Sequence, residues 1–356
     1  TRVRSSAASD VYKRQVYTMP EFLERRYNPQ SRTILSVISL VSYVLTKVAV
    51  TVYAGGLVFQ QVFGIKELWG IDFFWIAAIG LVVLTALYTI FGGMKSVLYT
   101  SVLQTPILLL GSLIILVLGF KELGGWDEMM RVCGAVTVND YGDTMTNLIR
   151  SNDDANFPWL GALIGSAIIG FWYWCTDQFI VQRVLSGKNE MEARRGTIFG
   201  AYLKLLPVFL FLIPGMIAFA LHQKYIGAGG EGFLPMLENG TANADAAFPT
   251  LVAKLLPAGV KGLVVCGILA ALMSSLASLF NSSAMLFTID FYKRFRPQTS
   301  EKKLVGIGQV ATVVIVILGI LWIPIMRSVG DVLYTYLQDV QSVLAPVSYT
   351  HLTLPT

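Results

Sequence analysis

Three ionisable side chains lie inside long apolar stretches of this sequence, where a charge is costly. Lys47 is in YVLTKVAV, Lys204 is in GAYLKLLPVF, and Asp177 follows four aromatic residues and two small ones in FWYWCTDQ. Charged residues in segments that cross a bilayer are rare, and they mark binding or transport sites until a structural role is shown. The structural alternative for Lys47 is internal pairing with a carboxylate or carbonyl group. For Lys204 it is extension of the ammonium group to the membrane surface.

Small residues recur every four positions in a later apolar stretch, GILAALMSSLASLFNSSAMLFT, residues 267–288. On a helix such rows share one face and let two backbones approach closely. The same face also offers oxygen atoms, which hard cations such as sodium prefer as ligands. Candidate ligands are the hydroxyls of Ser274 and Ser275 and the carbonyl of Ala271, so helix packing and cation binding are both open here. Gln338, in VLYTYLQDVQS, is a further polar candidate in a marginal helix.

The composition explains how these residues are positioned. Of 356 residues, 54% are hydrophobic and 14% are charged, whereas a soluble domain carries about 25% charged residues. Apolar runs this long predict transmembrane helices, because helices satisfy their own backbone hydrogen bonds in lipid. We expect an all-α polytopic membrane protein, with FGG at 91–93 forming a turn between two segments. The predicted segments are 34–59, 72–91, 99–120, 158–181, 198–221, 260–289, 304–325 and 330–346.

Lysine and arginine residues predict the orientation of these segments. They are densest in the short connections 20–33, 92–98, 182–197 and 290–303, which the positive-inside rule assigns to the cytoplasm. The longer loops 121–157 and 222–259 then face outside.

Several functional classes are excluded by what the sequence lacks. Three cysteines and two histidines give no disulfide framework, metal cluster or histidine-based catalytic site, and no glycine-rich loop cradles a phosphate, so we do not expect an enzyme. Much of the net charge of +5 lies in residues 1–15, so it does not indicate a nucleic-acid partner. Residues 1–15 and 347–356 resemble translated sequencing adapters, which leaves 16–346 as the membrane domain.

Five segments in order make the chain similar to the sodium/solute symporter family, closest to its sodium/sugar branch. They are YTMPEFLERRY, IFGGMKSVLYTSVLQT, WYWCTDQFIVQR, GAYLKLLPVFLFLIPGMI and SSLASLFNSSAMLFTIDFYKR. The resemblance implies a core of ten helices in two inverted five-helix repeats. The eight segments would be core helices three to ten, so core helices one and two are expected to be absent from this stretch.

The resemblance also implies roles for single residues. It places an aromatic gate at a break in the sixth core helix, with Tyr173 as the gate and Trp174 beside it. It implies that Lys204 and Gln338 contact a sugar and that Tyr43 is an aromatic residue of the same pocket. It implies that Ala271, Ser274 and Ser275 bind a sodium ion.

Three positions depart from the family pattern. Ser101 stands where sugar symporters usually have an aspartate, and Ala277 stands where two-sodium members have a threonine. These departures favour a single sodium ion. Gly170 replaces an asparagine of the bacterial sugar symporter, so the hydroxyl pattern read on the sugar differs.

The expected function is sodium-coupled symport of a sugar or polyol across the cytoplasmic membrane by alternating access. Inositol, sialic acid, an amino acid or an anion are alternative solutes. A solute sensor built on the same helical module is the main alternative from another class, and a membrane enzyme is a distant third.

Overall fold

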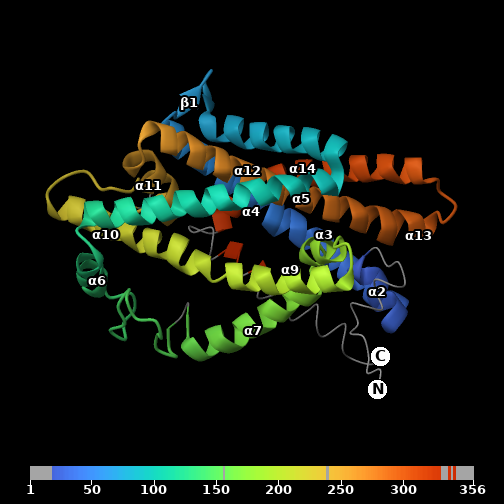
Figure 1. Ribbon diagram of the computed structural model, residues 1–356, viewed down its shortest axis with the longest axis horizontal. Helices are drawn as coiled ribbons and strands as arrows, with labels where there is room; N and C mark the ends of the chain where they lie inside the picture. The colour runs from blue at the N-terminus through green and yellow to red at the C-terminus, as the bar shows by residue number, and fades with distance from the viewer. Residues whose placement is uncertain (1–17, 155–156, 238–239, 330–335, 338–339, 342–356) are drawn as a thin grey trace.

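The computed structural model describes residues 18–154, 157–237, 240–329, 336–337 and 340–341, and this part of the chain is mostly helical (Figure 1). For residues 88, 90–97, 100 and 326–329 the description covers the backbone alone. In chain order the helices are α2 (Met19–Arg26), α3 (Pro29–Ser42), the π-helix η1 (Tyr43–Val48), α4 (Ala49–Phe63), α5 (Phe73–Leu123), α6 (Trp126–Gly134), α7 (Trp159–Cys175), α8 (Gln178–Leu185), α9 (Glu190–Leu203), the π-helix η2 (Val208–Leu212), α10 (Ile213–Gly227), the 3-10 helix η3 (Ala244–Ala246), α11 (Ala247–Leu255), α12 (Ala258–Met285), the π-helix η4 (Leu286–Tyr292), α13 (Lys293–Phe295) and α14 (Glu301–Val329). A short antiparallel hairpin joins β1 (Glu67–Leu68) to β2 (Ile71–Asp72).

Most predicted membrane segments are confirmed as long apolar helices. Five helical stretches have the length and composition to cross a bilayer: Pro29–Phe63, Ser101–Leu123, Glu190–Gly227, Ala258–Phe295 and Glu301–Ile325. The bent pair α7 and α8 makes up to a sixth, and Phe73–Leu87 is a shorter apolar helix. The last predicted segment, 330–346, lies mostly outside the described residues. The chain is thus a multi-pass membrane protein.

Helix α5 differs from the prediction in one respect. Its helical backbone is continuous through residues 91–93, where we expected a turn. At 1.5 Å per residue, a straight helix of 51 residues would be about 76 Å long, more than twice the ~30 Å hydrocarbon core. Figure 1 shows instead that the first part of α5, in light blue, and the second part, in teal, run in different directions and meet at a sharp bend. The two segments are therefore separate in space, although no loop divides them.

The helix that contains Lys47 has clear start and stop signals. Asn28 caps α3 by accepting a hydrogen bond of 2.8 Å from the backbone N–H of Ser31, and Pro29 occupies the first turn. The helix continues through η1 and α4 and ends at Gly64, whose φ of 65° suits a residue without a Cβ. A π-helical turn within a long helix is rare and is often found at functional sites.

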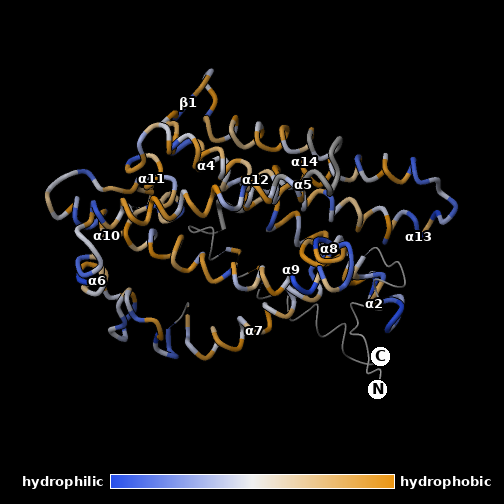
Figure 2. The backbone as a smooth tube through the Cα atoms, viewed as in Figure 1, coloured by the Kyte–Doolittle hydropathy of each residue, from blue (hydrophilic) through white to orange (hydrophobic). Residues whose placement is uncertain are grey.

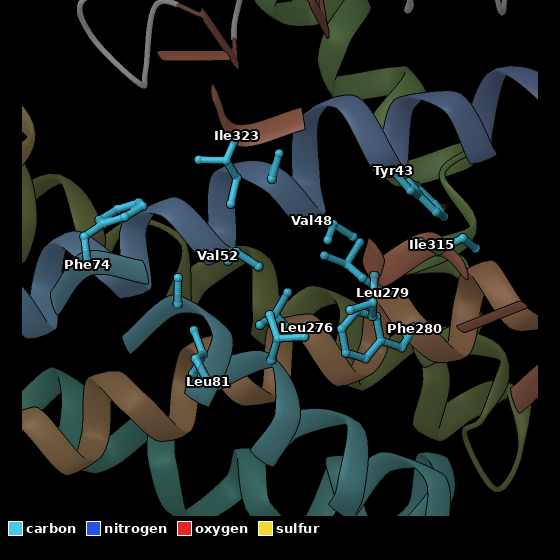
Figure 3. Packing of buried hydrophobic residues seen from close by; sticks show 14 of the residues in the cluster. Tyr43, Val48, Val52, Phe74, Leu81, Leu276, Leu279, Phe280, Ile315 and Ile323 are labelled. Atoms are coloured by element: carbon cyan, nitrogen blue, oxygen red, sulfur yellow. The ribbon is translucent and has the colours of Figure 1, made fainter. Parts of the chain in front are cut away.

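Helix α12 lies between the two main clusters of buried side chains. In the first cluster, Leu276 and Phe280 of α12 pack with Val48 and Val52 and with Ile315 of α14 (Figure 3). The second cluster joins α12 to α5, α6, α10 and α11. Glycines allow the close approach that lipid-embedded helices need: a Cβ on Gly267 would lie 2.9 Å from Cγ2 of Ile107, and one on Gly111 would lie 2.5 Å from Cγ2 of Val264.

Apolar side chains also cover the outside of the bundle. Figure 2 shows hydrophobic residues along the long helices and more hydrophilic ones at their ends and connections. Large apolar side chains on the outer surfaces are exposed, for example Leu163 of α7 (62% exposed) and Val310 of α14 (65% exposed). Such surfaces are typical of helices surrounded by lipid.

The polar loop after α6 is ordered around one carboxylate. Asp143 accepts hydrogen bonds from the side chains of Asn139 (2.9 Å) and Asn147 (3.0 Å) and from the backbone N–H of Ser151 (2.7 Å). These bonds, the Asn139 bond first among them, lower the pKa of the Asp143 carboxyl. This loop lies outside the membrane-crossing helices.

Candidate functional site

A break between α7 and α8 is the centre of the candidate site. Helix α7 ends at Cys175, α8 begins at Gln178, and the two axes differ by 47°. Asp177 caps α8 by accepting a hydrogen bond of 3.2 Å from the N–H of Phe179, and its own N–H donates to the carbonyl of Trp172. The break expected at FWYWCTDQ is therefore present, with its backbone groups satisfied by local hydrogen bonds.

The two intramembrane charges nearest the break form an ion pair. Nζ of Lys47, on η1, donates to Oδ2 of Asp177. The hydroxyl of Tyr43 donates to Oδ1 of the same carboxylate at 2.6 Å and accepts from the N–H of Phe179 at 2.9 Å. Asp177 is 2% exposed, so the pair is removed from solvent. The expectation that Lys47 pairs internally with a carboxylate is confirmed.

Aromatic rings surround the Lys47 ammonium group. Its Nζ lies 4.7 Å from the ring centre of Tyr43, 5.0 Å from that of Phe179 and 5.5 Å from that of Trp172. Cation–π attraction in a desolvated setting is worth about 2 kcal/mol, so the rings and the carboxylate together offset part of the cost of burying this charge.

A second group of contacts ties α8 to the small-residue row of α12. Nη2 of Arg183 donates to Oγ of Ser278 at 2.5 Å, and Oγ of Ser282 donates to Oε1 of Gln182 at 2.8 Å. Gln178 at the start of α8 also accepts from the backbone N–H of Met19 at 2.8 Å, which fixes α2 to the break. Helix α8, the second half of the broken helix, is therefore held by polar contacts with α12 and with α2.

Arg183 and Gln182 were not predicted from the sequence as functional residues. Both belong to α8, a short helix whose remaining side chains are mostly apolar. Their signal in the sequence was limited to polar side chains in an otherwise mostly apolar stretch. The pairing itself joins residues about a hundred positions apart, which a single sequence does not reveal.

Three predicted solute contacts do come together. Nζ of Lys204, at the end of α9, lies 4.2 Å from the ring centre of Tyr173 and 4.8 Å from that of Trp174. The two rings are 5.7 Å apart and perpendicular. An ammonium donor beside two aromatic faces can bind a hydroxylated solute, through hydrogen bonds to hydroxyls and through packing against C–H groups.

The remaining predicted solute contacts are placed differently. Tyr43 is 1% exposed, and its hydroxyl already serves Asp177 and Phe179. In this conformation it supports the break and presents no open face, so its contact with a solute stays a prediction. Gln338 lies outside the described residues.

The predicted cation ligands lie on an unbroken helix. Ser274 is 5% exposed, and its hydroxyl is 2.6 Å from that of Ser101 on α5. Ala271 and Ser275 are half-buried on the same helix. Ala277 is fully buried and offers only a methyl group where a further hydroxyl could have been. The row thus combines close packing with hydroxyl groups, and the structure does not separate these two roles.

The described residues were also compared with the requirements of a metal site. No three His, Cys, Asp or Glu side chains within that part of the chain come close enough to hold a metal ion. His222, 3% exposed, accepts a hydrogen bond of 3.0 Å from the N–H of Leu234, which is a structural role.

Comparison with known proteins extends over nearly the whole chain. The chain is 39% identical over 344 residues to sodium/myo-inositol cotransporter 2 of Bos taurus, and the match covers 93% of this chain and 50% of that protein. It is 37% identical over 343 residues to sodium/glucose cotransporter 4 of Mus musculus, and this match covers 93% of this chain and 49% of that protein. The chain spans about half the length of the curated relatives it matches.

A solved structure shares the fold. A Na⁺-coupled sialic acid symporter in a substrate-bound outward-open state matches with a TM-score of 0.74 at 22% identity, over 97% of this chain and 68% of that one. This likeness confirms the predicted transporter fold.

The family comparison is equally broad. The model of the sodium:solute symporter family matches residues 6–354, a range that enters both adapter-like ends. Both ends lie entirely outside the described residues, and their non-native origin stays a prediction. With a family match over most of its length, the chain belongs to the sodium:solute symporter family.

Proposed function

We propose that this chain forms part of a sodium-coupled symporter that moves a sugar or related polyol across the cytoplasmic membrane by alternating access. The observation that carries the proposal is the broken helix α7–α8, which puts two aromatic rings beside the Lys204 ammonium group at one end of the break. Discontinuous helices of this kind line substrate sites in secondary transporters. The names of the relatives, cotransporters of sodium with myo-inositol or glucose, support the same solute class.

The solute site would use Tyr173, Trp174 and Lys204. A polyol has both C–H faces and hydroxyl groups, so it can pack on the rings while the ammonium group donates to an oxygen. Lys204 would then exchange cation–π contacts for a charge-assisted hydrogen bond, worth about 1.5–3 kcal/mol. Tyr43 and Gln338 are proposed as additional contacts in a conformation that opens the site.

Sodium would bind on α12, with oxygen ligands from Ser274, Ser275 and Ala271. Ser101 contributes a neutral hydroxyl beside Ser274, and a hydroxyl attracts a cation less than a carboxylate does. Ala277 contributes no ligand. We therefore propose that one sodium ion moves with each solute molecule.

Coupling between the two ligands would pass through α8. This half-helix contacts α12 through Arg183 and Gln182, and it contacts η1 through the pair of Asp177 with Lys47. A sodium ion that stabilises one position of α12 would favour the position of α8 that matches it, and this biases the gate residue Tyr173. Alternating access needs such a two-state element that both ligands influence.

The proposed orientation places residues 182–197 and 290–303 in the cytoplasm. Both connections are rich in lysine and arginine, as the positive-inside rule requires. Tyr173 would then stand on the outer side of the Asp177 ion pair and act as an inner gate.

Transport by the full-length protein that carries this sequence tests the proposal. In proteoliposomes, an inward sodium gradient should drive accumulation of labelled myo-inositol or glucose, and a potassium gradient should not. Lys204→Gln should raise the half-saturating solute concentration about tenfold or more, because one charge-assisted hydrogen bond is lost. Lys188→Gln, in the connection before α9, is the matched control and should behave as the parent does.

The sodium site has its own test in the same assay. Ser275→Ala removes one ligand oxygen at a cost of about 1–3 kcal/mol, so half-maximal uptake should need about five- to hundredfold more sodium. The sodium dependence of the parent should be hyperbolic. A sigmoidal dependence would contradict the single-ion proposal, while specific binding without accumulation would indicate a sensor.

A further inference from the structure

An apolar groove lies on the outside of the bundle, between helices that are far apart in the sequence. It has a volume of about 590 Å³ and runs between α3 with η1, η4 and α14. Its walls are apolar or aromatic, and they include Leu40, Val44, Phe287, Tyr292, Ala311 and Val314. We call it the α3–α14 groove. Val314 is 48% exposed, so the groove opens on the outer surface of the bundle.

The length of the groove matches one leaflet of a bilayer. Its lining on α14 runs from Ile307 to Leu318. Eleven steps of 1.5 Å make about 16 Å, which is about half of the ~30 Å hydrocarbon core. A lipid tail of one leaflet therefore fits along it.

One end of the groove meets a cluster of positive charge. Tyr292 lines that end, and the next ten or so residues contain five basic side chains and a single acid, Glu301. The basic residues are Lys293, Arg294, Arg296, Lys302 and Lys303. Figure 2 shows the connection between α13 and α14 as hydrophilic. Within the described part of the chain, Arg296, Lys302 and Lys303 are exposed and have no carboxylate within ion-pair distance.

The basic end is fixed to the wall of the groove. Nη1 of Arg294 donates to Oγ1 of Thr33, in the first turns of α3, at 2.7 Å. This contact joins α13 to α3, one of the helices that form the walls of the groove. The connection that carries the basic residues is thus anchored beside the end of the groove that Tyr292 lines.

We propose that the α3–α14 groove binds an anionic phospholipid, with one acyl chain along α14 and the phosphate among Arg296, Lys302 and Lys303. Basic clusters next to transmembrane helices bind anionic headgroups, at about 1 kcal/mol per lysine or arginine. Another transmembrane helix is a poorer occupant. It could cover the apolar walls but would leave the charges of Arg296, Lys302 and Lys303 without a counter-ion, whereas a phospholipid in the groove supplies a phosphate. The inference needs only that this end lies at a membrane surface, so it holds whichever solute is carried.

Photo-crosslinking in vesicles tests this inference. The full-length protein is placed in phosphatidylcholine vesicles that contain either a diazirine-tailed phosphatidylglycerol or a diazirine-tailed phosphatidylcholine. Mass spectrometry should find adducts on residues 40–45 and 307–318 with the anionic lipid, at several times the yield obtained with the zwitterionic lipid.

Two variants separate the groove from general lipid contact. Val314→Trp fills the groove and should remove most of these adducts, whereas Val313→Trp, at a neighbouring position with the same 48% exposure but outside the lining, should leave them unchanged. Exchange of Arg296, Lys302 and Lys303 for glutamine should lower the anionic yield at least tenfold, since each charge is worth about fivefold. These three side chains are exposed and form no ion pair within the described part of the chain, so the fold should persist.

The outcomes decide the matter in either direction. Three results would each overturn the proposal: equal adduct yields with the two lipids, adduct yields unchanged by Val314→Trp, or cross-links from the groove to another protein segment.

Discussion

The ion pair of Lys47 with Asp177 gives the sharpest test of the site. We consider Lys47→Met, Asp177→Asn and the double variant. Methionine keeps much of the lysine chain length without the charge, and asparagine keeps the ability to cap α8. Each single change leaves the other charge inside the bundle: an ammonium group ringed by aromatic side chains, or a carboxylate with only the Tyr43 hydroxyl and one backbone N–H.

The expected magnitudes follow from desolvation. Breaking a buried ion pair by removing one partner costs about 3–5 kcal/mol, because an uncompensated charge remains. Removing both charges avoids that cost, and such double replacements range from neutral to stabilising. We therefore expect each single variant to be destabilised by about 3–5 kcal/mol and the double variant by clearly less than either one. The coupling energy should reach about 3 kcal/mol.

Equilibrium unfolding in mixed micelles, followed by tryptophan fluorescence, measures these free energies. Lys204→Met serves as control, since this lysine is exposed and makes cation–π contacts alone, so about 0.5–1 kcal/mol should be lost. The reasoning is refuted if Asp177→Asn is nearly neutral, or if the two single effects simply add. Either result would mean that the pair does not hold two charges in the folded protein.

Three further predictions concern packing, the outer loop and topology. Gly319→Ala on α14 should lower the free energy of unfolding by about 1–3 kcal/mol, because the new Cβ would lie 2.5 Å from Cγ1 of Val48 on η1. Gly306→Ala on the same helix is the control: its Cβ would meet nothing within 4 Å, so it should be neutral or stabilising in the same unfolding assay. Hydrogen bonds lower the pKa of the Asp143 carboxyl, so the order of its loop should be constant from pH 7 to about 4. That order should be lost as the pH falls below this value, because the carboxylate protonates. Spin-label mobility in the loop would measure this, and loss of order already near pH 6 would contradict it. In intact cells, an impermeant reagent should label a cysteine at Gly142 and spare one at Ser186, and the opposite pattern would reverse the proposed orientation.

Local physics made most of the helices predictable. In lipid the backbone N–H and C=O groups have no water to bond, so a helix must satisfy them internally. Long apolar runs with few charges were therefore sufficient evidence for all but the shortest membrane crossings. The bend in α5 was harder. Two glycines at 92 and 93 suggested a turn, but glycine only permits a turn, and packing of both parts of α5 against neighbouring helices decides the backbone path.

The site was predictable in kind more than in detail. The cost of a buried charge implied that Lys47 has an anionic or carbonyl partner, and Asp177 was itself conspicuous in an apolar run. Their pairing across 130 positions is a property of the fold, because a sequence carries no distance information between segments. Tyr43 illustrates the limit: an aromatic residue suited to a solute pocket is, in this conformation, a buried hydrogen-bond donor to the carboxylate at the break.

The small residues of α12 show why packing and function were hard to separate from sequence. A serine is small enough for close helix contact and polar enough to bind a neighbour, so one row can do both. Gly267 brings α12 close to α5, Ser274 meets the hydroxyl of Ser101, and Ser278 and Ser282 hold α8. A helix that carried its cation ligands on a face without such contacts could bind sodium and still move independently of the gate. The candidate cation ligands lie one or two turns from the contacts with α8, so in the proposed mechanism the position of the gate would depend on the same helix, as coupling requires.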